Sequence, residues 1–318
     1  MLTTQNIDAV VRMALAEDAP WGDVTSTAII PAETVASASL VSRESGVFSG
    51  GEVFAATFRA LDPSLIVEVL VGDGTTFTAG TTLATVTGTA RSILGAERVA
   101  LNLTQRLSGI ATLTARYVEL VAGTSARVVD TRKTTPGLRA LERHAVRSGG
   151  GHNHRFSLSD AVLAKDNHLA ILTAGGRSVT EVLLEVRAGL SHTTHLEVEV
   201  DRLDQIEAVL AAGVDTIMLD NFSLDDLREG VELIAGRALI EASGNVNLDT
   251  IAGIAATGVD IISVGALTHS VRALDLGLDV DLGTASPSIA PEVPATAAAD
   301  LAGDSGNATV SPIFGPRA

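Results

Sequence analysis

Cationic side chains gather in one stretch of the chain, from Asp130 to His168. The stretch contains D-T-R-K-T-T-P-G-L-R, then G-G-G-H-N-H-R, then L-A-K-D-N-H. Its basic residues include Arg132, Lys133, Arg139, Arg143, Arg155 and Lys165, together with His144, His152, His154 and His168. The formal net charge of the whole 318-residue chain is −16. A cluster of positive charge inside an acidic protein can focus its own field, and it predicts a pocket for a small polyanion.

Acidic residues and glycine-containing segments follow further along the chain. Glu199 and Asp220 offer carboxylates, and Mg²⁺ is typically held by one or two carboxylates together with phosphates of the substrate. Ser243-Gly244-Asn245 and Gly265-Ala266 have the character of turns whose backbone N–H groups cradle a phosphate. The joint pattern predicts a site for a phosphorylated sugar with a metal ion, beside a second anion. Arginine suits a carboxylate as that second anion, because its planar guanidinium binds both oxygens.

Each of these residues also has a purely structural interpretation. The Arg132-Lys133 pair could be a solvated turn, and a histidine such as His154 is more often structural than catalytic. Glu199 and Asp220 could cap the helices that follow them. Polar residues nevertheless recur at the same point of successive units, which a surface without a site would not require. This recurrence favours the functional interpretation.

The elements that must position these residues alternate in a regular way from Arg127 onward. Strands are expected at Val128–Asp130, Val162–Lys165, Leu196–Val200, Thr216–Asp220, Ala238–Ser243 and Ile261–Gly265. Helices are expected at Val179–Ala188, Leu203–Ala212, Leu224–Ala235 and Leu248–Thr257. Repeated units with almost continuously apolar strands imply a buried parallel sheet, with its chemistry at the carboxyl ends of the strands. A closed or nearly closed barrel is favoured, because no Gly-x-Gly-x-x-Gly motif follows any strand.

The chain before this region has a different pattern. Helices are expected at Thr3–Ala16, at Phe54–Leu61 and at Arg91–Val121, with Gly109 interrupting the last of them. Between Val35 and Val86, alternating apolar residues and glycine turns predict short antiparallel strands. This part is therefore expected to be an α+β unit of ordinary domain size.

Composition excludes several functional classes. The acidic balance argues against nucleic acid or an anionic membrane as the general partner, and an aromatic content of 3% argues against a stacking surface for single strands. The chain contains no cysteine, which rules out disulfides and thiolate metal sites. The N-terminus does not read as a signal peptide, and no apolar run approaches about 20 residues, so a cytoplasmic protein is expected. Residues 284–318, rich in Ala and Pro, are expected to be disordered.

Several blocks of the sequence are distinctive when taken together. They include E-R-V-A-L-N-L-T-Q-R-L-S-G-I-A-T at Glu97–Thr112 and E-A-S-G-N at Glu241–Asn245. Further blocks lie at Glu17–Ser26, Asp130–Arg139, Gly149–Asp160, Lys165–His168, Glu197–Asp201, Leu219–Phe222 and Val264–Ser270. Through these blocks the sequence resembles the quinolinate phosphoribosyltransferase family, also called nicotinate-nucleotide pyrophosphorylase (carboxylating). The resemblance extends from Leu2 to about Leu282 and leaves out the C-terminal residues.

The resemblance implies an α/β fold with an N-terminal α/β sandwich domain and an incomplete α/β barrel of the seven-stranded type. The sandwich with its linking helix would take residues 1–123, and the barrel residues 124–272. Residues 273–283 would return to the N-terminal domain. A homodimer, or a hexamer built from dimers, is also implied, in which the N-terminal domain of one subunit covers the barrel of another.

The resemblance further implies a role for each matching residue. Arg132, His154, Arg155 and Lys165 would bind the two carboxylates of quinolinate, and Arg106 would reach the site of a partner subunit. Lys133 would contact the pyrophosphoryl group of phosphoribosyl pyrophosphate, while Glu199 and Asp220 would hold the ribose hydroxyls and Mg²⁺. Ser243, Gly244, Asn245, Gly265 and Ala266 would hold the 5′-phosphate. Lys133, Glu199 and Asp220 would be catalytic, and Arg139, Arg143, His144 and His152 would not be needed as ligands.

The implied reaction is phosphoribosyl transfer to quinolinate with decarboxylation, giving nicotinate mononucleotide, pyrophosphate and CO₂ for de novo NAD biosynthesis. Three alternatives stay open on the sequence alone. A paralogous phosphoribosyltransferase could act on another ring, Lys165 could form a Schiff base as in a class I barrel aldolase, or the protein could bind without catalysis. Turnover of quinolinate against nicotinate, borohydride trapping and pyrophosphate release distinguish these three.

Overall fold

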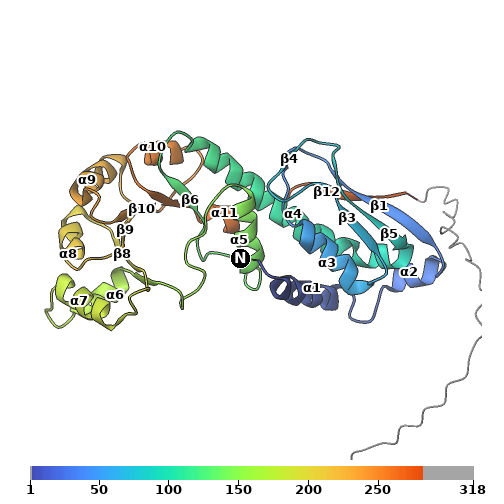
Figure 1. The fold of residues 1–318 in the computed structure, drawn as a ribbon, viewed down its shortest axis with the longest axis horizontal. Coiled ribbons are helices and arrows are strands. Elements are labelled where there is room, and N and C mark those ends of the chain that lie inside the picture. The colour runs from blue at the N-terminus through green and yellow to red at the C-terminus, as the bar shows by residue number, and fades with distance from the viewer. Residues whose placement is uncertain (1, 282–318) are drawn as a thin grey trace, which may run out of the picture. The chain divides into compact units, whose positions relative to one another are not determined.

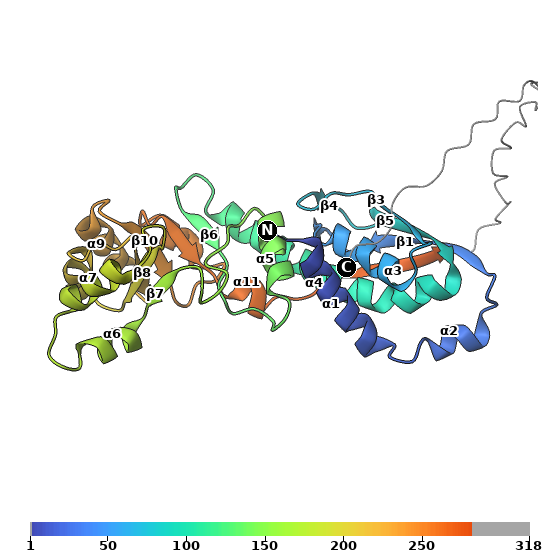
Figure 2. The same ribbon diagram turned by 60° about the horizontal axis from the view of Figure 1, so that its bottom comes forward.

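The computed structural model describes residues 2–281. The N-terminal half of the fold is built on an antiparallel sheet. Its four strands, in spatial order, are β12 (Leu276–Asp281), β1 (Val35–Ser42), β5 (Thr82–Thr89) and β3 (Ile66–Val69). A separate pair consists of β2 (Gly46–Val47) and β4 (Thr76–Phe77). The helices of this half are α1 (Thr4–Asp18), α2 (Val24–Ile29), α3 (Gly51–Leu61) and α4 (Ala90–Leu120). Figure 2 shows β12 lying beside β1, although the two strands come from opposite ends of the described chain.

Alternation of side chains along β1 explains why this sheet packs on one face. Ala36, Ala38 and Leu40 are buried, because every second residue of a strand points to the same face. They join Phe54 and Phe58 of α3 in one hydrophobic cluster. The first half is therefore an α+β unit with its own core, as the sequence predicted.

Helix α4 is continuous over 31 residues and does not break at Gly109. The prediction of an interruption there was wrong. A Cβ at Gly109 would lie 2.2 Å from the carbonyl oxygen of Arg272, and the amide of Leu274 donates to the carbonyl of Gln105 at 2.9 Å. Glycine costs a helix about 1 kcal/mol relative to alanine, but here it lets the returning chain approach the helix closely.

Six parallel strands form the sheet of the second half, in the order β6, β11, β10, β9, β8, β7. Their bounds are β6 (Arg127–Val129), β7 (Val162–Ala164), β8 (Leu196–Val200), β9 (Thr216–Asp220), β10 (Leu239–Ser243) and β11 (Ile261–Ser263). The helices are α5 (Arg139–Ser148), α6 (Asp166–Thr173), α7 (Val179–Gly189), the 3₁₀ turn η1 (Leu203–Gln205), α8 (Ile206–Leu210), α9 (Leu224–Ile234), α10 (Ile251–Ala255) and α11 (Ala266–His269). Helices α7 to α10 lie on the outer side of the strands (Figure 1). The predicted strand–helix alternation is confirmed.

The barrel stays open between β7 and the segment around His152. His152 forms a single parallel bridge with Val129, in which its amide donates to the carbonyl of Val128 at 2.8 Å. This segment takes the place of a seventh strand next to β6. Within residues 2–281, no strand pairing connects it to β7. An N-terminal sheet domain followed by an incomplete α/β barrel is the expected fold class, and it is confirmed.

Strand register brings the carboxyl ends of the strands to one edge of the barrel. Ser243 of β10 pairs with Asp220 of β9, and Glu199 of β8 pairs with Met218. The polar residues that follow each strand therefore come together although they are far apart in sequence. No helix among the described residues has the length and apolar character needed to cross a bilayer.

A polar contact that is partly open to solvent joins the two halves through Asp73. Its carboxylate accepts the amides of Gly50 and Gly51, at 3.1 and 3.0 Å, where α3 begins. It also lies 2.6 Å from Nε2 of His144 on α5. Burial acts to raise the pKa of Asp73, but His144 and the two glycine amides outweigh it and lower the pKa. The carboxylate is thus more stable as an anion in the folded chain.

Replacing Asp73 with asparagine is expected to lower the free energy of unfolding by about 1–2 kcal/mol at neutral pH, since the pair is partly open to solvent. Because the folded pKa lies below that of the unfolded chain, this stabilisation is fully present above the ordinary aspartate pKa of about 3.9. It is lost as the pH falls through the folded value. Urea unfolding of both proteins at pH 7 and near pH 3 measures it. An equal difference at both pH values would contradict the assignment.

Candidate active site

A cavity of about 700 Å³ opens at the carboxyl edge of the barrel strands. It is lined by twelve residues that the sequence singled out: Arg132, Lys133, His154, Arg155, Lys165, Glu199, Asp220, Ser243, Gly244, Asn245, Gly265 and Ala266. Other residues of the lining include Thr131, Met218, Asn221, Glu241, Ser263 and His269. The structure therefore brings together every predicted site residue except Arg106.

Arg132 and Arg155 form the most cationic part of this cavity. The buried Nε of Arg132 has no hydrogen-bond acceptor among the described residues. Arg155 donates from Nη1 to the carbonyl of Ala161 at 3.0 Å. Burial, followed by the nearby charge of Arg132, lowers the pKa of Arg155. Two guanidinium groups that repel each other in a cleft would both be stabilised by a dianion between them.

A buried aspartate holds the segment that carries His154. Asp130 is fully buried and accepts the His154 amide at 2.8 Å and Nδ2 of Asn153 at 2.6 Å. Nη1 of Arg143 lies 3.4 Å from the same carboxylate and donates to the carbonyl of His154 at 2.7 Å. Burial raises the pKa of Asp130, against the opposing charge of Arg143. Arg143 therefore acts on the backbone of the site.

Arg139 and His144 also contact protein groups. Arg139 donates to Oγ1 of Thr134 at 2.9 Å and to the carbonyl of Phe156 at 3.1 Å. His144 pairs with Asp73. These contacts give Arg139, Arg143 and His144 positions in the framework around the cavity, and none of the three lines it.

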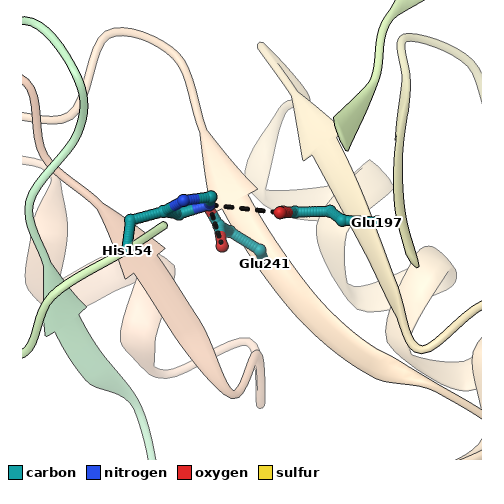
Figure 3. Close-up of side chains that lie close together, drawn as sticks. All are labelled: His154, Glu197 and Glu241. Carbon is teal, nitrogen blue, oxygen red and sulfur yellow. Dashed lines mark ion pairs between the residues drawn. The ribbon is translucent and has the colours of Figure 1, made fainter. Parts of the chain in front are cut away.

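His154 lies close to two buried glutamates on β8 and β10, strands that β9 separates (Figure 3). Its Nε2 is 3.2 Å from Oε2 of Glu197 on β8 and 3.4 Å from Oε2 of Glu241 on β10. The amide of Arg155 donates to Nδ1 of His154 at 2.7 Å, so Nδ1 carries no proton. The imidazole is thus the tautomer with hydrogen on Nε2, directed at the two carboxylates.

The charge of His154 follows from opposing effects. Burial lowers its pKa, whereas hydrogen bonds to Glu197 and Glu241 and the charges of both raise it, to about 10. A second proton would sit on Nδ1 and break the bond from the Arg155 amide. The raised pKa favours a cationic ring beside the two carboxylates, whereas the amide contact favours an unprotonated Nδ1. Burial also raises the pKa of Glu197.

The spacing of this cluster would also suit a metal ion, because one ligand atom from each of the three residues lies within 4.8 Å of the others. A histidine bound to metal through Nε2 donates its other N–H to a neighbouring acceptor. Nδ1 of His154 accepts a hydrogen bond instead. The cluster is therefore a hydrogen-bonded group, and its two unpartnered oxygens are Oε1 of Glu197 and Oε1 of Glu241.

Sequence reasoning missed Glu197 and Glu241 as members of the site. A signal was present, since each acid interrupts an apolar strand, in L-E-V-E-V and in L-I-E-A-S. Acids at buried strand positions are rare unless they are paired. Their partner, His154, comes from a separate loop, so the pairing itself was not visible in the sequence.

Two lysines and a glycine also line the cavity. The Lys165 ammonium contacts the carboxylate of Glu199. A Cβ at Gly265 would lie 3.2 Å from Cδ of Lys133 and 2.9 Å from Nε2 of His269. Glycine at this position therefore lets the Lys133 side chain lie directly against the backbone that follows β11.

Arg106 does not line the cavity of its own chain. Its guanidinium donates to Oε1 of Glu142 at 2.8 Å, to Oγ1 of Thr135 at 2.8 Å and to the carbonyl of Thr268 at 2.8 Å, all in the same chain. Glu142 is fully buried and needs a cation beside it. That Arg106 reaches the site of a partner subunit stays a prediction; within its own chain the side chain is held by Glu142, Thr135 and Thr268.

Comparisons with known proteins bear on the whole described chain. The family model "Quinolinate phosphoribosyl transferase, C-terminal domain" matches residues 110–279, and the corresponding N-terminal domain model matches residues 23–108. The nicotinate-nucleotide pyrophosphorylase (carboxylating) of Mycobacterium leprae is 46% identical over 292 residues, covering 88% of this chain and 100% of that protein. The probable nicotinate-nucleotide pyrophosphorylase (carboxylating) of Bacillus subtilis is 41% identical over 270 residues, covering 85% and 92%.

Solved structures of similar proteins have the same fold as this chain. NadC from Streptococcus pyogenes superimposes with a TM-score of 0.84 at 43% identity, covering 88% of this chain and 98% of that one. Human nicotinic acid phosphoribosyltransferase gives a TM-score of 0.53 at 17% identity, a likeness of fold alone.

Proposed function

This chain belongs to the quinolinate phosphoribosyltransferase family, and from that premise we propose how its cavity performs the family's reaction. The protein is a decarboxylating phosphoribosyltransferase. It transfers the phosphoribosyl group of phosphoribosyl pyrophosphate to quinolinate, giving nicotinate mononucleotide, pyrophosphate and CO₂ in NAD biosynthesis. The assignment of individual residues to this reaction is the proposal.

Quinolinate, a pyridine dicarboxylate, is assigned to the Arg132 and Arg155 side of the cavity. The observation that carries this assignment is the pair of close guanidinium groups, one with a buried Nε that lacks an acceptor. Two carboxylates supply the charge and the acceptors that this pair needs. Lys165 lines the same cavity and adds a third cation. His154 forms the floor beside them, held by Glu197 and Glu241.

Phosphoribosyl pyrophosphate is assigned to the remaining strand ends. The 5′-phosphate would be held by polar groups at the ends of β10 and β11, from Ser243, Gly244, Asn245, Gly265 and Ala266. Glu199 and Asp220 fit Mg²⁺ and the ribose hydroxyls, because they lie near the ends of the paired strands β8 and β9 and both line the cavity. Bound Mg²⁺ supplies charge that stabilises the departing pyrophosphate.

The proposed reaction asks for positioning and electrostatics from the protein. The ring nitrogen of quinolinate attacks C1 of the ribose, and the C–O bond to pyrophosphate breaks as the N–C bond forms. Glu199 and Asp220 stabilise positive charge on the sugar, while Lys133 neutralises the leaving group. The bond from ring C2 to its carboxylate then breaks and CO₂ leaves. The electron pair stays on C2 beside the cationic nitrogen, and C2 takes a proton from water.

The direct test is formation of nicotinate mononucleotide from quinolinate and phosphoribosyl pyrophosphate. We expect equal amounts of CO₂ and pyrophosphate with Mg²⁺, and a fall of about 100-fold or more in rate when EDTA removes it. Nicotinate serves as the matched control substrate, since it has one carboxylate for the two arginines and no CO₂ to release. Turnover of nicotinate at a comparable rate would favour a paralogous activity, and undiminished turnover in EDTA would remove Mg²⁺ from the proposal.

Self-association and a cytoplasmic location are also proposed. Trp21, Val24 and Ile29 are 94%, 77% and 73% exposed, and an apolar group of this kind is typical of an interface. We propose a homodimer, or a hexamer built from dimers. Light scattering of the purified protein tests the oligomeric state, and a monomeric mass would exclude both the dimer and the hexamer.

A further inference from the structure

The side-chain amide of Asn221 connects two other polar residues at the cavity, Asp220 and Asn245. Nδ2 of Asn221 donates to Oδ2 of Asp220 at 2.7 Å, and Oδ1 of Asn221 accepts from Nδ2 of Asn245 at 3.1 Å. The backbone amide of Asn221 donates to the carbonyl of Ser243 at 2.9 Å. Asn221 thus connects the carboxylate at the end of β9 with the loop that follows β10.

The backbone at this point is in an unfavourable conformation. Among residues 2–281, only Asn221, Ala235 and Asn245 have positive φ without being glycine, with values of 59°, 49° and 52°. Two of the three lie in this cavity, on the two sides of the amide contact. Such conformations persist where the surrounding structure determines them, and they gather at functional sites. Asparagine tolerates this region better than most residues.

Close packing against Gly244 fixes the amide in place. A Cβ at Gly244 would lie 2.2 Å from Oδ1 of Asn221 and 2.8 Å from its backbone nitrogen. Gly244 itself has φ of +91°, a region that side chains rarely adopt. The loop after β10 therefore rests directly on the Asn221 amide, and this contact sets its distance from Asp220.

We propose that Asn221 is a positioning residue that sets the spacing between Asp220 and the loop of Ser243, Gly244 and Asn245. The inference rests on the proposed function, in which Asp220 holds the ribose hydroxyls and the loop holds the 5′-phosphate. These groups belong to one sugar phosphate, so a fixed spacing between the residues that hold them favours its binding. Asn221 and Asn245 are exposed, and exposed hydrogen bonds contribute little to folding. The effect of losing them falls on the substrate.

Asn221→Asp tests this with little change of shape. The variant keeps a residue tolerant of positive φ, but it replaces the donor to Asp220 with a second negative charge. We expect KM for phosphoribosyl pyrophosphate to rise about 10-fold or more, with less than about 2-fold change in the Kd of quinolinate measured alone by calorimetry. The thermal midpoint is expected to stay within about 2 °C of wild type, as for other exposed substitutions.

Asn167→Asp is the matched control, because Asn167 follows Asp166 after strand β7, which β8 separates from β9, and it is also exposed. It adds the same charge without touching the loop, and both constants are expected to stay near wild type. If Asn221→Asp fails to fold, Asn221→Gly accepts positive φ without a side chain and carries the same expectation. Equal weakening of both substrates, or equal effects of Asn221→Asp and Asn167→Asp, would overturn the inference. Failure of the wild-type protein to form nicotinate mononucleotide would instead overturn the proposed function.

Discussion

Replacing Arg155 or Arg132 with alanine is expected to lower kcat/KM for quinolinate by about 30- to 1000-fold, equivalent to about 2–4 kcal/mol of lost transition-state binding. Each arginine lies in the cavity, and the pair is short of protein acceptors, so most of its stabilisation must come from a bound anion. Removing one guanidinium leaves a quinolinate carboxylate desolvated without its partner. Steady-state kinetics with each substrate varied in turn measures the loss.

The effect is expected in KM for quinolinate, with KM for phosphoribosyl pyrophosphate changed far less. Arg127→Ala provides the control, because Arg127 begins β6 at its exposed amino end, away from the cavity at the other end of that strand. It removes the same charge from the chain. Wild-type kcat/KM in either Arg132→Ala or Arg155→Ala would show that the role given to that residue is wrong.

Replacing Arg106 with alanine is expected to lower the free energy of unfolding by about 3–5 kcal/mol, the usual cost of removing one partner of a buried ion pair. Glu142 is fully buried, and Arg106 contacts it at 2.6 Å. The second oxygen of Glu142 accepts the Thr135 amide at 3.1 Å, so the carboxylate cannot turn away to water. Urea unfolding followed by circular dichroism measures the change.

A double variant separates charge from packing at this position. Arg106→Met with Glu142→Gln removes both charges, keeps an acceptor for the Thr135 amide and is expected to recover much of the lost stability. The opposite pattern, full stability of Arg106→Ala with activity abolished, would support the prediction that this arginine serves a neighbouring subunit. The two readouts therefore decide between the two roles.

The barrel strands and helix starts followed closely from the sequence. All six strands were predicted to within one or two residues, because each is a short apolar run followed by polar residues at the active edge. Caps fixed the starts of α7 and α9, where Ser178 accepts from the Glu181 amide at 3.2 Å and Ser223 from the Asp226 amide at 3.1 Å. Hydrogen bonds of this kind join residues that are three positions apart in the sequence, so they are predictable.

Features that depend on distant residues were not predictable. Helix α10 begins at Ile251 instead of Leu248, because the side chain of Asn247 accepts the amides of Asp249 and Thr250 and forms a turn of its own. The commitment of Arg106 to Glu142 spans 36 positions, and a sequence does not show which acid an arginine meets. The twelve cavity residues were nevertheless predicted, since strand ends of a parallel sheet converge by topology alone.

Pairing of β12 with β1 makes the whole barrel an insertion between two strands of one sheet. Arg43 and Asp279, which contact each other at this edge, are 236 positions apart. During synthesis, the edge of β1 that pairs with β12 stays unpaired until the ribosome has made the entire barrel. Contacts of such long range slow folding, and an open edge invites wrong partners in the interval. The order of synthesis therefore places completion of the sheet by β12 after synthesis of the whole barrel.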